Sequence, residues 1–460
     1  MIVTSINPRT GERIRDFETS TPEQIDQAVI RATKAQLDWW EGRSREERAD
    51  ALQEMGRTFA KAKEQVVDIA FQEIGVPKRP IAASYDSALR GIDHYISRYE
   101  EYRDRPFPLD QDLWVNTEAC IRYEPHGVVG HIGVWNFPFW QTMITAIPAL
   151  LAGNAIVFKP SEMTTGTGLK IAELIHASGV PEDVYVPIVG GAETGKRLVR
   201  SQVDALVFTG GMRTGESIIR DSGVKPLVLE LSGNDPGIVC GDADIEQAAR
   251  GVATGTFSRA GQVCIRIKRV YVLESIADAF LERLLAIASR IDVREQVGPL
   301  IREEARERVH RVVMDAVSRG AELLAGGRKD DGPGFFYEPT VLLIKDDSLE
   351  VIAQETFGPV CSIRLVRSEE EAVELANASP YGLGATIWTA DMHRAGSLAS
   401  RLRAGNIWVN EWGRTLPGGE YFQGCKRSGI AGSQDRLGLF LRKKTVISHQ
   451  AKEPRPSWFS

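Results

Sequence analysis

Residues 127–162 read GVVGHIGVWNFPFWQTMITAIPALLAGNAIVFKPSE. In this stretch two short apolar runs, residues 128–134 and 155–158, stand on either side of a segment long enough for a helix. Short apolar runs of this kind are typical of strands buried on both faces, and strands that alternate with helices form a parallel sheet. The stretch therefore predicts the beginning of a doubly wound α/β domain.

The same alternation continues beyond residue 162. Further strands are predicted at residues 184–189, 205–208 and 227–229, and helices at residues 169–177, 194–199 and 214–220. A polar residue or a glycine follows each apolar run, and these residues are Asn136, Lys159, Gly190, Thr209 and Glu230. Ligands of such sheets bind at the carboxyl ends of the strands. We therefore expect these residues to lie around one binding site.

A second alternating region follows Asp235 and predicts another α/β domain. Its strands are expected at residues 238–239, 270–273, 341–344, 361–366 and 385–388, and its helices at residues 277–289, 305–317 and 370–377. Near the N-terminus, Thr21 and Ser44 each precede residues that favour the start of a helix. Residues 106–124 predict an extended hairpin that leaves the first domain. The tail, residues 443–460, is expected to form an exposed edge strand that pairs with another subunit.

The composition is that of a globular protein with more than one domain. The chain has 460 residues, which is too many for one hydrophobic core, and its 43% hydrophobic and 26% charged residues are ordinary values. A net charge of −6 without a basic block speaks against a nucleic-acid partner. No apolar run reaches the roughly 18 residues needed to span a membrane, and the first residues do not resemble a secretory signal. We expect no membrane association.

The cysteines and histidines exclude some classes of site. The five cysteines are scattered and form no C-x-x-C pair, which argues against a disulfide framework or a zinc ribbon and favours a reducing, cytoplasmic location. The seven histidines include no H-E-x-x-H pattern, so no metal site is predicted.

The candidate nucleophile is Cys264, at the end of residues 257–264, FSRAGQVC. It follows Gly261, a flexible residue, and Gln262, a polar one, which predicts an exposed turn. A sulfur in such a turn would suit a nucleophile. A lone cysteine is also commonly a small buried hydrophobe, and the octet alone is consistent with both.

Several motifs together resemble the NAD(P)-dependent aldehyde dehydrogenase superfamily. They are WNFP at 135–138, KPSE at 159–162, FTGG at 208–211, LELSG at 229–233, GQVC at 261–264 and ETFGP at 355–359, in the order that the family has. The resemblance implies a Rossmann-like NAD-binding domain from residues 1–106 and 126–231 and a catalytic α/β domain from residues 232–426. It also implies a small β oligomerisation extension from residues 107–125 and 443–460, and a homodimer or homotetramer.

The resemblance assigns a catalytic role to Cys264, Asn136 and Glu230. Cys264 would attack an aldehyde carbonyl to give a thiohemiacetal, which passes a hydride to NAD and becomes a thioester. The Asn136 amide and the Cys264 backbone N–H match the donors to the oxyanion, and Glu230 matches the base that activates water. Relatives that transfer the acyl group to coenzyme A typically lack this glutamate, so a free acid is expected. Without the motifs, Asn136 is also consistent with a turn and Glu230 with a helix cap.

The resemblance also implies a cofactor site. Lys159 and Glu162 resemble the pair that holds the adenosine ribose, and a carboxylate there would repel a 2′-phosphate, which favours NAD over NADP. Glycine turns before two helices would hold the pyrophosphate. They depart from the family where Gly190 directly precedes another glycine and where Gly211 replaces a frequent serine. The other implied cofactor positions are Trp135, Gly195, Thr209, Gly210, Gly215, Leu231, Glu355 and Phe357. Solvated turns and core packing are the structural alternatives for these residues.

The substrate positions implied by the family are mostly aromatic or apolar. They are Phe137, Trp140, Gln141, Ile144 and Trp412. Core packing explains such residues equally well. Arg259 and Arg266 flank the nucleophile and would either bind a substrate carboxylate or phosphate, and lower the thiol pKa, or point to solvent. An arginine that semialdehyde-specific relatives carry is absent from residues 142–145, TMIT.

The leading hypothesis is therefore a NAD-dependent aldehyde dehydrogenase that releases a carboxylic acid. The alternatives are a coenzyme-A-acylating or semialdehyde-specific dehydrogenase and a cysteine hydrolase without a redox step. A protein that keeps the fold only for binding would bind NAD without turnover.

Overall fold

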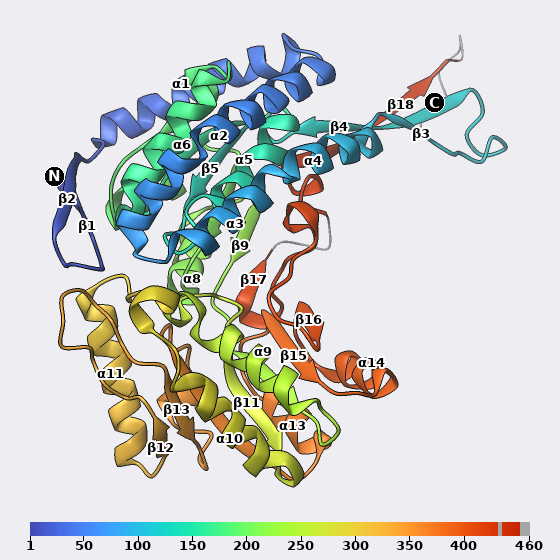
Figure 1. The fold of residues 1–460 in the computed structure, drawn as a ribbon. Helices are drawn as coiled ribbons and strands as arrows, with labels where there is room; N and C mark the ends of the chain where they lie inside the picture. Colours follow the sequence, from blue (N-terminus) through green and yellow to red (C-terminus); the bar gives the residue numbers. More distant parts are fainter. Residues whose placement is uncertain (431–434, 451–460) are drawn as a thin grey trace.

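The computed structural model describes residues 1–430 and 435–450. Two parallel sheets, each with its helices, form the bulk of the molecule, one above the other in the view of Figure 1. A third, antiparallel sheet extends to one side of the upper part. The predicted α/β fold class is confirmed.

The first sheet has the strand order β17-β9-β8-β5-β6-β7. Its strands are β5 Val128–Ile132, β6 Ala155–Lys159, β7 Tyr185–Pro187, β8 Ala205–Thr209, β9 Leu227–Glu230 and β17 Gly429–Ile430. Only the edge strand β17 is antiparallel to its neighbour among these strands. The chain moves outward from β5 through β6 and β7 and then returns to the other side of β5. Such a reversal opens a crevice between β5 and β8 at their carboxyl ends.

The helices of the first part are α1 Pro22–Glu41, α2 Arg45–Ile74, α3 Lys78–Leu89, α4 Gly91–Tyr99, α5 Trp140–Leu151, α6 Thr165–Ala177, α7 Ala192–Arg200 and α8 Met212–Asp221. Helices α1 and α2 begin where the sequence predicts, whereas α6, α7 and α8 begin two to four residues before the predicted positions. Thr21 and Gln24 form a reciprocal capping box before α1, and Ser44 and Glu47 form another before α2. Such caps satisfy backbone N–H groups that the helix leaves free, and each stabilises the helix by about 1 kcal/mol.

The second sheet has the strand order β12-β13-β14-β11-β10-β15-β16. Its strands are β10 Asp235–Val239, β11 Ile267–Leu273, β12 Glu322–Ala325, β13 Thr340–Leu343, β14 Val360–Val366, β15 Gly384–Trp388 and β16 Asn406–Val409. Its helices are α9 Ile245–Phe257, α10 Ala277–Ala288, α11 Glu303–Ser318, α12 Glu350–Ala353, α13 Glu369–Asn377 and α14 Met392–Arg401. The edge strands β12 and β16 are additional to the predicted ones, because neither is an uninterrupted buried apolar run.

Both faces of the second sheet are buried. Val270 and Val272 of β11 lie in one hydrophobic core, whereas Tyr271 and Leu273 lie in the core on the opposite face. Successive side chains of a strand point to opposite faces, so this division follows from the strand geometry. It explains why the strand reads as a continuous apolar run.

The third sheet has the order β18-β4-β3, with β3 Arg105–Phe107, β4 Thr117–Pro125 and β18 Leu441–His449. The predicted hairpin is present, although residues 108–116 between its strands form a loop. β18 pairs antiparallel with β4 along its whole length. The predicted tail strand therefore exists, and residues 451–460 of that prediction lie outside the described residues.

Residues 435–440, which precede β18, lie against the first part of the molecule. Leu437, Phe440 and Leu441 are buried in its core. The predicted domains leave residues 427–442 unassigned, and among the described residues of this range β17 pairs with β9 of the first sheet and residues 437–441 pack against that sheet. At the other end of the chain, β1 Ile2–Ile6 and β2 Arg13–Glu18 form a separate hairpin. The assignment of the parts to cofactor binding, catalysis and oligomerisation stays a prediction.

Within the described ranges, none of the helices combines the length and the apolar character needed to cross a membrane.

Candidate active site

A cavity of about 190 Å³ lies at the carboxyl ends of β5, β8 and β9, against residues of the second part. It is lined by Val134, Trp135, Asn136, Phe137, Gln141, Thr209, Gly210, Gly211, Glu230, Leu231, Ser232, Cys264, Glu355, Phe357, Leu383 and Phe422. Cys264, Asn136 and Glu230 are all among these residues. Two sheets thus bring together side chains that are far apart in the sequence.

The turn before Cys264 has a left-handed backbone. Arg259, Ala260 and Gly261, between α9 and β11, have φ values of 54°, 54° and 68°. This conformation costs about 1–2 kcal/mol for each residue with a Cβ, so Arg259 and Ala260 are strained. At Gly261 a Cβ would lie 2.1 Å from the carbonyl oxygen of Gly358. A glycine is therefore required here for conformation and for space.

Gln262 holds this turn from inside the protein. Its Nε2 donates to the carbonyl oxygens of Arg259 and Pro299 at 3.1 and 3.0 Å, and its Oε1 accepts from the backbone N–H of Ile301 at 2.8 Å. The prediction that Gln262 makes the turn exposed is wrong. The side chain is buried because it satisfies backbone groups of the turn and of the following loop.

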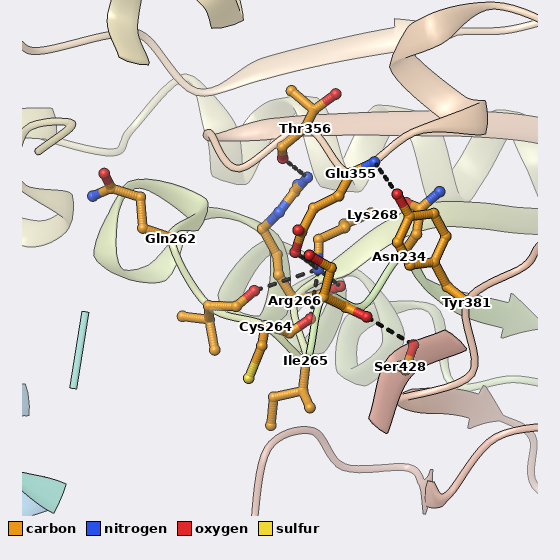
Figure 2. Close-up of polar contacts among 12 residues, drawn as sticks. Asn234, Gln262, Cys264, Ile265, Arg266, Lys268, Glu355, Thr356, Tyr381 and Ser428 are labelled. Atoms are coloured by element: carbon orange, nitrogen blue, oxygen red, sulfur yellow. Dashed lines mark hydrogen bonds and ion pairs between the residues drawn. The ribbon is translucent and has the colours of Figure 1, made fainter. Parts of the chain in front are cut away.

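Lys268 lies on the opposite side of the turn from the sulfur. Its buried Nζ donates to the carbonyl oxygen of Cys264 at 2.6 Å and lies 3.6 Å from Oε1 of Glu355. Figure 2 shows the ammonium group among these oxygens, while the sulfur of Cys264 points away from them. Burial raises the pKa of the Cys264 thiol to about 12, although Lys268 acts to lower it. The thiol is therefore protonated at neutral pH in this state.

Asn136 lies just beyond the end of β5 and contacts the nucleophile turn. Its Nδ2 donates to the carbonyl oxygen of Gln262 at 2.9 Å, and its own carbonyl oxygen accepts from Nη1 of Arg259 at 3.1 Å. An amide nitrogen carries two hydrogens, so the second can donate to an oxyanion in the cavity. The arrangement suits the role that the sequence implies for Asn136.

Glu230, the last residue of β9, is held by two buried side chains. Its Oε2 accepts from Nε2 of Gln141 at 3.0 Å, and its Oε1 accepts from Nη2 of Arg436 at 2.5 Å. Burial is the largest single influence and acts to lower the pKa of Arg436, but Glu230, Tyr95 and Glu420 together raise it. Sequence reasoning missed Arg436, because no motif marks it. The only available signal is an arginine among the apolar residues that precede β18.

A groove of about 610 Å³ adjoins the cavity. Both are lined by Val134, Trp135, Thr209, Gly210 and Gly211. Lys159 and Glu162 lie on the wall of the groove, with Nζ of the lysine 3.3 Å from Oε2 of the glutamate. Lys159 is buried, whereas the carboxylate is 43% exposed and can reach a ligand. The groove thus presents one free carboxylate where the sequence predicts the adenosine ribose.

The glycine turns differ in what they contribute to the groove. Gly195, Gly210 and Gly211 line it, close to the N-termini of α7 and α8. Backbone N–H groups at a helix N-terminus bind phosphate well. Gly190 and Gly215 do not line the groove, because a Cβ on them would lie 1.9 Å from Oγ1 of Thr194 and 2.5 Å from Cδ2 of Leu231, respectively. Their role as cofactor contacts stays a prediction, and the structure gives both glycines close packing neighbours.

The positions predicted to surround the nicotinamide lie together. The rings of Trp135 and Phe357 meet edge to face with 5.7 Å between their centres, and both line the cavity. Glu355 and Leu231 line the same cavity. These residues come from both parts of the molecule, so a ligand bound among them would contact both.

The predicted substrate residues are only partly brought together. Phe137 and Gln141 line the cavity, whereas Trp140, Ile144 and Trp412 do not. Ile144 is fully buried in α5, and the indole N–H of Trp412 donates to the carbonyl oxygen of Ile265 at 2.7 Å. Trp140 and Trp412 are partly buried, so core packing takes only Ile144 out of reach of a ligand.

An outer groove of about 920 Å³ continues the cavity toward the surface. Phe422 lines both spaces. Trp408, Leu416 and Tyr421 line the outer groove, and the last two are 57% and 50% exposed. The lining of this groove mixes these apolar and aromatic side chains with charged ones, which are Arg90, Glu411, Arg414 and Glu420.

Neither arginine beside the nucleophile enters the cavity. Arg259 donates to the carbonyl oxygens of Asn136 and Pro80, and its guanidinium lies 4.0 Å from the centre of the Phe137 ring. Arg266 donates to the carbonyl oxygens of Val360 and Thr356. Both side chains are buried, so the prediction that they point to solvent is wrong. Their donors satisfy backbone carbonyl groups of Asn136, Pro80, Val360 and Thr356.

A parallel sheet with a groove at its carboxyl ends, and a cysteine in the cavity that adjoins this groove, define the class as an α/β oxidoreductase. The chain matches the Aldehyde dehydrogenase family over residues 2–446, and it belongs to that family. The protein therefore oxidises an aldehyde to a carboxylic acid, and its family uses NAD or NADP.

Relatives with different substrates are about equally similar. Succinate semialdehyde dehydrogenase [NAD(P)+] Sad of Escherichia coli is 33% identical, over 96% of this chain and 97% of its own. Betaine aldehyde dehydrogenase of Bacillus subtilis is 33% identical, over 99% of this chain and 95% of its own. The crystal structure of betaine aldehyde dehydrogenase from Staphylococcus aureus with NAD+ has a TM-score of 0.95 at 28% identity, over 100% of this chain and 94% of its own. The similarities leave the aldehyde open.

Proposed function

We propose that this protein oxidises its aldehyde through a thioester on Cys264, with Asn136 as an oxyanion donor and Glu230 as the base. The observation that carries the proposal is that these three side chains line one cavity, which adjoins the groove of Lys159 and Glu162. Nucleophile, oxyanion donor and base must all reach the same carbon for this chemistry.

The reaction uses the residues in sequence. The thiol of Cys264 gives up its proton to solvent and the sulfur adds to the carbonyl carbon, while the Asn136 amide donates to the oxyanion. A bound NAD would supply the acceptor for the hydride, whose loss from the adduct leaves a thioester on Cys264. Water then adds to the thioester, Glu230 takes a proton from that water, and the bond from carbon to sulfur breaks. A carboxylic acid leaves and the cysteine is restored.

NAD is proposed as the preferred cofactor. The free carboxylate of Glu162 in the groove can accept a hydrogen bond from a ribose 2′-hydroxyl, and it would repel a 2′-phosphate. Lys159 is engaged by Glu162 and by the carbonyl oxygen of Pro160, which leaves it poorly placed to compensate.

Hydrolysis is favoured over acyl transfer to coenzyme A, because Glu230 lines the cavity and is held there by its contact with Arg436. A hydrolase without a redox step would not need the adjoining groove. A cytoplasmic location and a homodimer or homotetramer remain proposals from the sequence.

An uncharged, apolar aldehyde is the substrate class that the cavity favours. The cations next to the cavity are each engaged by other groups of the protein: Arg259 and Arg266 by carbonyl oxygens, Lys268 by the Cys264 carbonyl and Arg436 by Glu230. None of them is among the residues that line the cavity in the described part of the chain. Within the cavity itself, a substrate carboxylate would thus lose its hydration without gaining a cationic partner, which is costly. The arginines that line the outer groove are Arg90 and Arg414.

A panel of aldehydes tests this function. The purified protein is mixed with aliphatic, aromatic, carboxylated and quaternary-ammonium aldehydes, with NAD or NADP, and NADH or NADPH absorbance is followed. We expect the highest kcat/KM with NAD and an uncharged aromatic or aliphatic aldehyde. A strong preference for succinate semialdehyde or betaine aldehyde would contradict the substrate class, and acid formation without NADH would contradict the redox reaction.

The matched variants are Cys264→Ser and Cys425→Ser. Cys425 is also partly exposed but does not line the cavity. Cys264→Ser is expected to lower kcat by at least about 1,000-fold while NAD binding persists, and Cys425→Ser is expected to keep wild-type rates. Turnover by Cys264→Ser at the wild-type rate would refute the assignment of the nucleophile.

A further inference from the structure

The proposed reaction assigns no role to Arg436, although its side chain contacts Glu230. Arg436 belongs to residues 435–440, which precede β18 and lie against the first part of the molecule. Its Nη2 donates to Oε1 of Glu230 at 2.5 Å, and its Nε donates to the carbonyl oxygen of Gly419 at 3.2 Å. The two ionised side chains are 4% and 6% exposed. They form a buried ion pair.

The backbone of Arg436 is held by a second carboxylate. Its N–H donates to Oε2 of Glu420 at 2.8 Å, and Oε1 of Glu420 lies 3.2 Å from Nε2 of His94. The guanidinium therefore has little freedom to turn away from Glu230. Directional contacts of this kind give an arginine a more defined position than a lysine would have.

Both oxygens of Glu230 are engaged, one by Arg436 and the other by Gln141. A carboxylate bound at both oxygens has one orientation, and here that orientation keeps it on the wall of the cavity that contains Cys264. A buried carboxylate without a counter-charge takes up a proton or turns toward water. Either change would remove a base from the cavity.

We propose that Arg436 is a positioning residue for hydrolysis of the thioester, which acts by holding the Glu230 carboxylate directed at the cavity. In this step the oxygen of water bonds to the thioester carbon, Glu230 takes the proton, and the sulfur leaves. Formation of the thioester does not use Glu230 as a base. Loss of Arg436 therefore affects the second half of the reaction and spares the first. The inference rests on the proposed thioester reaction.

The test separates these two half-reactions in Arg436→Gln and Arg436→Lys. The first turnover of NADH is followed by stopped-flow absorbance, and decay of the acyl-enzyme is followed by quenching and intact-protein mass spectrometry. We expect the rate of NADH formation in the first turnover to stay within about threefold of wild type. Decay of the acyl-enzyme is expected to slow at least tenfold in Arg436→Gln and by an intermediate factor in Arg436→Lys, which keeps the charge but not the geometry.

Arg442→Gln is the matched control, because Arg442 is an exposed arginine nearby that pairs with Glu124 at 3.3 Å. It is expected to leave both rates unchanged. Removing one partner of a buried pair can destabilise a protein by about 3–5 kcal/mol, so Arg436→Gln can fail to fold. In that case Arg436→Lys, which keeps a counter-charge for Glu230, decides the question alone.

Unchanged decay of the acyl-enzyme in the folded variants would overturn the proposal. An equal slowing of NADH formation and of acyl-enzyme decay would also overturn it, since a merely structural role of Arg436 would lower both rates alike. A wild-type protein that forms no NADH with any aldehyde would instead overturn the proposed function itself, so the two failures are distinguishable.

Discussion

The thiol of Cys264 is protonated in the free protein, because burial raises its pKa to about 12 despite the nearby Lys268. The ammonium group of Lys268 is directed at the backbone oxygen of Cys264 and at Glu355, and it does not contact the sulfur. Reactivity of this cysteine thus depends on what enters the cavity.

The pH dependence of alkylation tests this state. Below the pKa of a thiol, the thiolate fraction rises tenfold for each pH unit. With a pKa of about 12, alkylation of Cys264 by iodoacetamide in the absence of NAD is expected to rise about tenfold per unit from pH 7 to pH 10 without levelling off. The rate is measured by peptide mass spectrometry, which separates Cys264 from Cys120 and Cys425. A plateau near pH 8 would show that the thiol is activated in the free protein.

The motifs predicted the catalytic side chains, but not what surrounds them. Asn136, Glu230 and Cys264 stand in recognisable sequence patterns, and the structure brings them to one cavity. Arg436 lies 206 residues from Glu230 in the sequence, and only the return of the chain to the first sheet brings the two together. The nearness of Arg259 to Cys264 in sequence was misleading, because sequence distance does not give the direction of a side chain.

Among the elements, the left-handed turn of Arg259, Ala260 and Gly261 is the one on which the site depends most. It connects α9 to Cys264 within a few residues and is held by Gln262 and by the two arginines. Such strain persists only where the surroundings hold it in place.

Two glycine substitutions compare this turn with another part of the site, the lining of the cavity at Gly211. Gly261→Ala is expected to destabilise the protein by several kcal/mol, because its φ is 68° and a Cβ would lie 2.1 Å from a backbone oxygen. Gly211→Ala is expected to change stability by less than about 1 kcal/mol, since nothing lies within 4 Å of a Cβ there and its φ is −68°. Urea unfolding of both variants measures the difference. Equal stabilities would contradict the account of the turn.

The strands were predictable for a physical reason. A strand buried on both faces, such as β11, needs an apolar residue at nearly every position, so its sequence is distinctive. β12 was not predictable, because this edge strand is largely exposed and mixes acidic and apolar residues. The loop at residues 108–116 was not predictable either, since prolines and extended residues occur in loops and strands alike.

On the scale of the whole molecule, the predicted role of the third sheet in joining subunits rests on its free edge. β18 is an edge strand, and no strand within the described ranges pairs with its outer side. Unpaired edges of this length readily accept a strand from another chain. Ile447 of β18 is 57% exposed, which is unusual for an isoleucine in a monomer surface strand.

Ile447→Asp is therefore expected to weaken self-association, because a charge would be buried in a subunit contact. Light scattering after size-exclusion chromatography should show an oligomer for the wild type and a smaller species for the variant. Leu37→Asp, at a similarly exposed position on α1, serves as the control and should keep the wild-type mass. A wild-type monomer, or an oligomer unaffected by Ile447→Asp, would count against this role of β18.

The central claim is that Cys264 carries a thioester that Glu230 hydrolyses, and the Glu230→Gln variant tests it most directly. The variant is mixed with NAD and the best aldehyde of the panel, and its intact mass is measured together with the NADH formed. We predict about one equivalent of NADH per active site, followed by a halt, and a gain of the aldehyde mass less two hydrogens on the peptide that contains Cys264. Continued turnover at the wild-type rate, or the absence of an adduct on Cys264, would contradict the account.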